Sequence, residues 1–193
     1  MHGIGNDYVY VNCFEEEIKD PVKAAPIISD RHFGVGSDGL ILILPSKVAD
    51  CKMRIFNADG SEAQMCGNGI RCVAKYVYDH KITAKNPLIV ETLAGVKTIQ
   101  LFTTNGKVSS ARVNMGKPGL MRTEIPMIGK DTQVIDEPFT LDNGLPFHIT
   151  CVSMGNPHCV IFVDNFEEVD LPRQGAEIER HHSFPERTNV HFV

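Results

Sequence analysis

The stretch NADGSEAQMCGNGIRC, residues 57 to 72, leads from a predicted strand into a predicted helix. Apolar residues recur at helical spacing from Ile70 onward, at Ile70, Val73, Ala74, Val77 and Tyr78. Cys66 is therefore expected at or just before the helix N-terminus, where the helix dipole and free backbone N–H groups stabilise a thiolate. This setting predicts a reactive cysteine, with a buried helix-capping cysteine as the alternative.

The segment Gly67-Asn68-Gly69 favours anion binding beside that cysteine. Glycines let a backbone approach a ligand closely, and consecutive N–H groups at a helix start can bind a carboxylate. The sequence thus predicts a nucleophile or base next to a carboxylate site. Cys72 lies further along the same helix and is expected to serve packing.

The remaining pattern alternates short strands with turns, which predicts an α+β fold. A short helix is expected over residues 20–30. Composition changes after residue 115, where Pro, Gly and Met become frequent, so two sheet-rich halves are predicted, 1–112 and 113–193. The expected strands are 8–13, 40–44, 52–57, 88–92, 97–103, 109–114, 147–154 and 159–163.

A short internal repeat links the two halves. Gly5-Asn6 and Gly155-Asn156 each precede an alternating apolar strand, 150 residues apart. A weaker match relates the segments that lead to the strands at 40–44 and 190–193. The pattern indicates a duplication, although Gly-Asn before a strand can also recur by chance. A second helix-start cysteine would then be expected near position 216, beyond Val193.

Five asparagines stand beside Gly or turn residues at predicted strand and loop ends. An asparagine offers a donor and an acceptor together, which suits the ammonium and carboxylate of an amino acid. Each one alone is more typical of a turn. As a set they predict a zwitterionic ligand, contacted by Asn6, Asn57, Asn68, Asn156 and Asn189.

Composition excludes several classes of protein. The 193 residues carry a net charge of −5 without a basic stripe, which disfavours nucleic acid as a partner. No apolar run approaches the roughly 20 residues of a membrane helix. The N-terminus lacks the features of a signal peptide, so a cytoplasmic protein is expected. The six cysteines form no CxxC pair and are expected to be free thiols.

Other chemistries find weaker support. His158 could serve as the base of a Cys–His hydrolase, but no hydrolase signature accompanies it. The spacing of His181, His182 and His191 fits no familiar metal site, so a solvated face is expected and no metal is predicted. Gly34-Val35-Gly36 lacks the helix and acidic partner of a dinucleotide loop. No lysine has a recognisable setting for pyridoxal phosphate, and no cofactor is predicted.

Taken together, these motifs resemble diaminopimelate epimerase. The resemblance rests first on Asn57-Ala58-Asp59-Gly60-Ser61 followed, four residues later, by Cys66-Gly67-Asn68-Gly69-Ile70-Arg71. It extends along the whole chain, in order, through the segments 1–7 (MHGIGND), 153–158 (SMGNPH) and 184–189 (FPERTN).

The resemblance implies a cofactor-free isomerase that interconverts LL- and meso-2,6-diaminopimelate, a step toward lysine and peptidoglycan. It implies two similar halves, each a curled sheet around a central helix, with the site in the cleft between them and the second half incomplete here. A homodimer is the expected assembly. Related racemases of proline type read Cys-Gly-His in the first motif, so Asn68 favours diaminopimelate.

By resemblance, Cys66 is one of two catalytic cysteines, a thiolate removing the α-proton on one face while a thiol donates a proton on the other. His158 matches a histidine that tunes the thiols. Gly67 and Asn68 match the loop that binds the α-carboxylate. The substrate-contacting positions are matched by Asn6, Asn57, Asn156 and Asn189.

Two departures from the family pattern stand out. Gly39 occupies a position where some members have a glutamine contact to the substrate. The second cysteine, in an Ala-Cys-Gly context, would follow Val193, so the 193-residue chain alone is expected to be inactive. Two alternatives stay open: a racemase of another amino acid on the same fold, and a non-catalytic binding protein if the chain ends there.

Overall fold

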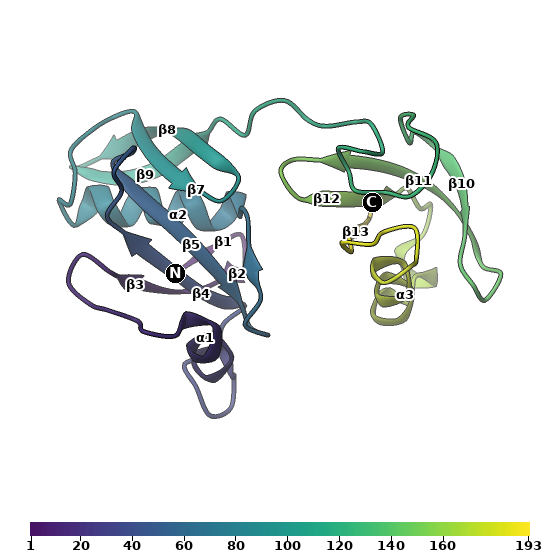
Figure 1. Ribbon diagram of the computed structural model, residues 1–193, viewed down its shortest axis with the longest axis horizontal. Helices are drawn as coiled ribbons and strands as arrows, with labels where there is room; N and C mark the ends of the chain where they lie inside the picture. Colours follow the sequence, from purple (N-terminus) through teal and green to yellow (C-terminus); the bar gives the residue numbers. More distant parts are fainter. The chain divides into compact units, whose positions relative to one another are not determined.

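The computed structural model describes all residues, 1–193, and divides into two compact units, Met1–Met115 and Gly116–Val193. Each unit has its own sheet and its own apolar core. Figure 1 labels the elements along the chain. The α+β class is confirmed, because sheets dominate both units and only a few helices accompany them.

The sheet of the first unit has seven strands and curls around a helix (Figure 1). Most neighbouring strands are antiparallel, whereas the β3–β4 and β5–β7 pairs are parallel. A separate two-stranded ribbon is formed by β1 (His2–Gly3) and β2 (Asn6–Asp7). The strand order is β3 (Val9–Asn12), β4 (Gly39–Leu44), β5 (Cys51–Asn57), β7 (Leu88–Thr92), β8 (Gly95–Thr104) and β9 (Lys107–Val113), with β6 (Glu62–Ala63) paired to β5.

The central helix is α2 (Gly67–Asp79), which begins where the cysteine motif predicts. Its residues Ile70, Val73, Ala74 and Val77 are fully buried against the inner face of the sheet. Burying a side chain of the size of valine or isoleucine stabilises a fold by about 1.5–3 kcal/mol. This packing fixes the direction in which the N-terminus of α2 presents Cys66.

Strand β4 is buried on both faces, which explains its unbroken apolar sequence GLILIL. Ile41 and Ile43 belong to the core around α2, whereas Leu40 and Leu42 pack with Ala25 of α1 (Pro21–Ser29) on the other face. The predicted helix over residues 20–30 is confirmed, and Asp20 caps it by accepting a hydrogen bond from the backbone N–H of Lys23.

The second unit has a four-stranded sheet with short helical segments packed against it. Ile178 and Phe184 are buried there with Ile149, Cys151 and Cys159. No helix as long as α2 occurs in this unit. Its elements are β10 (Glu137–Thr140), β11 (Pro146–Ser153), β12 (Pro157–Ile161), the 3-10 turn η1 (Phe166–Glu168), the π-helical turn η2 (Leu171–Gly175), α3 (Ala176–Glu179) and β13 (Asn189–Phe192).

The strand register of the two units supports the duplication. Val9 pairs with Leu40 in the parallel β3–β4 ladder, and Cys159 pairs with Val190 in the parallel β12–β13 ladder. Each position in the first pair therefore recurs 150 residues later in the second. The helical segment between the strands keeps the same offset, with α1 over residues 21–29 and η2 plus α3 over residues 171–179.

The helix starts of the two units also match. Asp20 and Asp170 each accept a hydrogen bond from the backbone N–H three residues later and form an ion pair with that residue, Lys23 or Arg173. A register, a helix and a cap that agree at one offset are stronger evidence for a duplication than the short sequence match.

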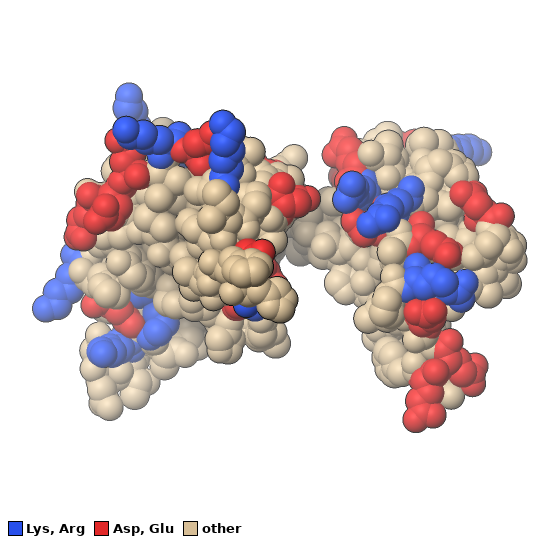
Figure 2. All heavy atoms as spheres, turned by 90° about the horizontal axis from the view of Figure 1, so that it is seen from below, with Lys and Arg blue, Asp and Glu red and all other residues tan.

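The charged surface is mixed in sign. On the face drawn in Figure 2, lysine and arginine side chains lie among aspartates and glutamates, without a broad basic patch. None of the helices combines the length and the apolarity that a bilayer-spanning helix needs.

Candidate active site

Cys66 caps helix α2, in the position that the sequence predicts. Its backbone is extended, with φ −139° and ψ 111°, and its Sγ accepts a hydrogen bond from the backbone N–H of Gly69 at 3.2 Å. The first intrahelical hydrogen bond runs from the Ile70 N–H to the Cys66 carbonyl. The N–H groups of Gly67 and Asn68 therefore precede the helical ladder and point out of the helix start.

Close packing requires a glycine at position 69 of this loop. A Cβ on Gly69 would lie 2.6 Å from Cδ1 of Ile41, inside the core of the unit. Gly3 is equally confined, because a Cβ there would lie 3.0 Å from Cβ of Asn68. The helix start thus lies directly against the N-terminal strand β1.

Asn6 is the polar side chain in contact with the Cys66 thiol. The Cys66 Sγ lies 3.4 Å from Oδ1 of Asn6, a separation at which the S–H donates to the amide oxygen. On its other side, Nδ2 of Asn6 donates to Oδ2 of Asp38 at 2.9 Å. The structure therefore brings two of the predicted site residues together, 60 positions apart in the sequence.

Two tyrosines close to this site are kept neutral. Burial raises the pKa of Tyr8 to about 12, and the nearby Cys66 adds to that rise. Burial also raises the pKa of Tyr10, together with a contact to Cys72. Neither phenol is a base at neutral pH.

Asn57 and Asn68 are tied to their own turns. Nδ2 of Asn57 donates to Oγ of Ser61 at 3.0 Å, at the end of β5. Oδ1 of Asn68 accepts a hydrogen bond from the Arg71 guanidinium at 2.6 Å. The NH2 group of Asn68 takes no part in that bond. Asn57 also pairs with Gly39 in the β4–β5 ladder, so the two positions are neighbours.

Gly39 has no room for a side chain. A Cβ at this position would lie 2.3 Å from the Phe56 carbonyl oxygen and 2.9 Å from Cε1 of Tyr8. The close approach of β4 to β5 thus explains why position 39 is a glycine. In this protein no side chain from position 39 can reach a substrate.

In the second unit, three predicted residues meet at one end of the β12–β13 pair. Nε2 of His158 lies 3.1 Å from Oδ1 of Asn156, and Nδ1 lies 2.9 Å from Nε2 of His191. Asn189 pairs with His158 in the ladder, and its Nδ2 donates to the Pro157 carbonyl. Burial, and then the proximity of His191, lowers the pKa of His158, so the ring is neutral at neutral pH.

The other five cysteines have different settings, and all six are free thiols. Cys51, Cys72, Cys151 and Cys159 are buried, as expected for packing. Burial raises the pKa of Cys51 to about 12. Cys13 lies just beyond β3. Cys66 is the only cysteine that combines partial exposure with a helix N-terminus.

Sequence reasoning missed three residues that matter here, namely Arg31, Asp38 and Tyr8. Asp38 lies just after Gly34-Val35-Gly36, the segment that resembles part of a dinucleotide loop, and has no motif of its own. The signal that could have identified it is a carboxylate at the start of a buried strand, beside the Gly-Asn-Asp turn of the repeat. His191 was considered only for metal binding, whereas its ring contacts His158.

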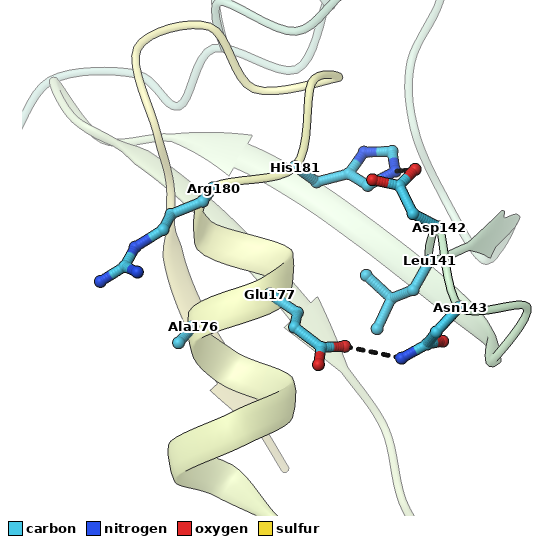
Figure 3. Close-up of a pocket in the computed structure, with 7 residues that line it drawn as sticks. All are labelled: Leu141, Asp142, Asn143, Ala176, Glu177, Arg180 and His181. Atoms are coloured by element: carbon cyan, nitrogen blue, oxygen red, sulfur yellow. Dashed lines mark hydrogen bonds and ion pairs between the residues drawn. The ribbon is translucent and has the colours of Figure 1, made fainter.

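The second unit also contains a pocket of about 430 Å³ (Figure 3). His181 and Asp142 line it, and with His182 they bring potential metal-ligand atoms within 4.8 Å of one another. The expectation of a solvated face is wrong for His181, which is 6% exposed and packs edge-on against Phe139. This burial lowers the pKa of His181.

The tautomer of His181 argues against metal binding in this pocket. Its Nδ1 accepts a hydrogen bond from the backbone N–H of Ser183, so the neutral ring has its proton on Nε2. Nε2 is the atom that faces Asp142, at 3.7 Å from Oδ1. A metal there would need the lone pair of Nε2, with the proton on the other nitrogen.

Comparison of the sequence with known proteins identifies its family. The family model for diaminopimelate epimerase matches residues 1–121 and 150–193. The chain is 56% identical to the diaminopimelate epimerase of Agathobacter rectalis, covering all of this chain and 70% of that protein. It is 52% identical to the enzyme of Methanococcus maripaludis and 53% identical to that of Acetivibrio thermocellus, in both cases covering all of this chain and 69% of the relative.

Solved structures share the fold at low identity. A hydroxyproline epimerase from Agrobacterium vitis matches with a TM-score of 0.58 and 14% identity, covering 84% of this chain and 49% of that one. A PhzF-family phenazine biosynthesis protein from Bacillus anthracis matches with a TM-score of 0.56 and 21% identity, covering 86% and 53%. The sequence matches are far closer, and they decide the assignment: the chain belongs to the diaminopimelate epimerase family.

Proposed function

We propose that this chain supplies the Cys66 half of the active site of a diaminopimelate epimerase, an isomerase that interconverts LL- and meso-diaminopimelate. The observation that carries the proposal is the setting of Cys66, half-buried at a helix N-terminus between the Gly69 N–H and the Asn6 amide oxygen. The helix dipole and the N–H stabilise a thiolate, and the amide oxygen stabilises a thiol. Both protonation states that a proton-transfer group needs are therefore provided for.

In this proposal the helix start also binds the substrate. The N–H groups of Gly67 and Asn68 are free of the helical ladder and lie at the positive end of the dipole, where an α-carboxylate is favoured. Amide groups of the other asparagines contact the remaining polar groups of the amino acid. The substrate-contacting set is Asn6, Asn57, Gly67, Asn68, Asn156 and Asn189.

Inversion at the α-carbon requires proton removal on one face and proton delivery on the other. Cys66 acts on one face. None of the other five cysteines has a helix-start setting, so we assign the second transfer to none of them. The 193-residue chain by itself is expected to epimerise slowly, since a positioned acid or base contributes roughly 10²–10⁴-fold to a rate.

His158 is proposed as a residue that acts on the protonation of the reacting thiols. It is neutral and bonded to both Asn156 and His191, so its ring is held in one orientation. With the Asn156 oxygen facing Nε2, the proton lies on Nε2 and Nδ1 accepts from His191. It therefore offers a fixed dipole without adding a charge at neutral pH.

We further propose that the reaction needs no cofactor and no metal, and that the protein acts in the cytoplasm as a homodimer. The supporting observations are indirect: thiol chemistry at Cys66 requires no prosthetic group, and free thiols suit a reducing compartment. Sedimentation of the protein that contains this chain tests the dimer, and retention of activity after dialysis against a chelator tests the metal.

A racemase of another amino acid is the second candidate. The chain shares its fold with the hydroxyproline epimerase. A cysteine at a helix start would suit such a racemase equally well. Asn68, rather than histidine in the first motif, favours diaminopimelate. Substrate profiling separates the two, because diaminopimelate, unlike hydroxyproline, has a second amino-acid centre for distant amide groups to bind.

The deciding experiment is epimerisation of LL-diaminopimelate in deuterium oxide by the protein that contains this chain. We expect the meso isomer to form with deuterium at the inverted carbon, and Cys66→Ala to lower the rate by roughly 10²–10⁴-fold. Cys13→Ala is the matched control, because it removes a partly exposed thiol that is not at a helix start. Full activity of Cys66→Ala would remove Cys66 from the mechanism.

A further inference from the structure

Asp38 lies at the centre of a polar network that ends on Cys66. Its Oδ2 accepts hydrogen bonds from Nδ2 of Asn6 and from the backbone N–H of Asp7, both at 2.9 Å. The backbone N–H of Asp38 in turn donates to the Asp7 carbonyl at 2.8 Å. The loop before β4 and the strand β2 are thereby joined at one carboxylate.

Arg31 fixes that carboxylate from the outside. Its guanidinium donates to Oδ1 of Asp38 at 3.0 Å and to both carboxylate oxygens of Asp7, at 2.8 and 3.3 Å. The Arg31 side chain is exposed, so these ion pairs add little to global stability. Their effect is local. The guanidinium of Arg31 has donors in a fixed planar arrangement, which determines the orientation of the Asp38 carboxylate.

The network decides which end of the Asn6 amide faces Cys66. An ionised carboxylate can only accept hydrogen bonds, so the NH2 group of Asn6 must face Asp38. The amide oxygen then faces the Cys66 Sγ, 3.4 Å away. The opposite orientation would place two acceptors against each other at Asp38 and is excluded.

An oxygen facing sulfur favours one protonation state of Cys66. A thiol satisfies Asn6 and Gly69 together, because its S–H donates to Asn6 and its lone pair accepts from the Gly69 N–H. The neutral Tyr8 hydroxyl is a third polar neighbour of the sulfur in either protonation state. A thiolate keeps the Gly69 contact but meets the lone pairs of the Asn6 oxygen. The orientation imposed by Asp38 therefore opposes the effect of the helix N-terminus.

We infer that Asp38, held by Arg31, is a positioning residue that orients Asn6 so that Cys66 rests as a protonated thiol, the proton donor of the pair. The inference rests on the proposed role of Cys66. Asp38 itself contacts neither Cys66 nor a substrate; it acts through Asn6. The titratable and charged groups of this network and around it are Asp7, Tyr8, Tyr10, Arg31, Asp38 and Cys66.

The test is the alkylation of Cys66 by iodoacetamide at neutral pH, followed by peptide mass spectrometry without any substrate. Cys13 serves as an internal reference for general loosening, so the ratio of the two alkylation rates is the readout. In Asp38→Ala the Asn6 amide is free to turn its NH2 group toward the sulfur. We expect the Cys66 to Cys13 ratio to rise about tenfold, the effect of one hydrogen bond to a charged group.

Two variants make the result specific. Asp38→Asn keeps an oxygen that can accept from Asn6 and should return the ratio to near the wild-type value. Asp20→Ala removes a carboxylate that caps α1 and should leave the ratio unchanged. In Asp38→Ala, the alkylation profile should also shift to lower pH, which loss of structure alone does not produce.

An unchanged or lower ratio in folded Asp38→Ala would overturn the inference. If Asp38→Ala fails to fold, Asn6→Ala decides, because removing the amide oxygen should raise the ratio in the same direction and a fall refutes the proposed orientation. The readout needs no turnover. A failure of the proposed function, seen as activity in Cys66→Ala, is therefore distinguishable from a failure of this inference.

Discussion

Residues 5–43 and 155–193 share one backbone plan but form two different polar networks. Both contain a Gly-Asn turn, a strand, an Asp-capped helical segment and a second, parallel strand in the same register. In the first, Asn6 turns its oxygen to a cysteine under the control of Asp38. In the second, Asn156 turns its oxygen to the ring of His158.

The residues at the positions equivalent to Asp38 and Tyr8 explain the difference. Position 188 corresponds to Asp38 and is Thr188, whose buried hydroxyl has no hydrogen-bond partner. Position 158 corresponds to Tyr8 and is a histidine. No carboxylate accepts a hydrogen bond from the NH2 group of Asn156. The orientation of its amide is instead set by His158, two residues later. The same strand pair can therefore present an asparagine either to a thiol or to an imidazole.

The largest expected difference between the two regions concerns catalysis. Only the first unit contains a helix-start cysteine within residues 1–193. We expect the isolated 193-residue polypeptide to epimerise LL-diaminopimelate roughly 10²–10⁴-fold more slowly than the enzyme of Agathobacter rectalis, assayed in parallel. Equal rates would mean that a second acid or base exists among the residues described here.

The equivalent helical segments should differ in their sensitivity to truncation. Ile178 of α3 is fully buried, whereas the corresponding Ile28 of α1 is only partly buried. Ile178→Ala should lower the free energy of unfolding by about 2–5 kcal/mol, and Ile28→Ala by clearly less. Urea unfolding of the two variants checks this, and an equal loss would show that the two segments are packed alike.

Acid should weaken the second region before the first. The pKa of His158 is lowered in the folded state, so the unfolded chain binds more protons below the ordinary histidine pKa. The stability that the neutral ring contributes is then lost as the pH falls from about 7 to 5. Tyr8, at the equivalent position, does not titrate there.

Amide exchange of β12 and β3 as a function of pH measures this contrast. We expect β12 to exchange faster in acid while β3 changes little, and His158→Gln to reduce the pH dependence of β12, because buried His181 in the same unit also has a lowered pKa. Parallel changes in both strands would instead indicate a global acid transition.

The smallest effect is expected where the two regions are alike. Asp20→Ala and Asp170→Ala each remove an N-cap and should cost about 1 kcal/mol, as helix caps usually do. The double variant should show the sum, because the sites share no partner. Thermal unfolding of the three variants tests this, and clearly unequal costs would separate the two caps.

Local sequence patterns predicted most of the first unit. The apolar run of β4, the helical spacing of α2 and the Asp-Pro start of α1 each report a regular element through its own residues. The short strands β1, β2 and β10 were not predicted. They pair because backbone from other parts of the chain lies beside them. Segments of two to four residues are too short to show the alternation of apolar and polar residues that indicates a strand.

For the site, the sequence alone determined that Cys66 begins a helix, since the spacing of α2 and the glycines around the cysteine are local features. It also determined the family, through motifs spread along the chain. Only the tertiary structure decided that Asn6 faces Cys66, that Asp38 and Arg31 orient it, and that Gly39 excludes a side chain. The contacts of Asn6 join residues 32 and 60 positions apart, and Arg31 contacts Asp7 across 24 positions. Gly39 depends on the close approach of two strands, and no local pattern encodes such distances between atoms separated in the chain.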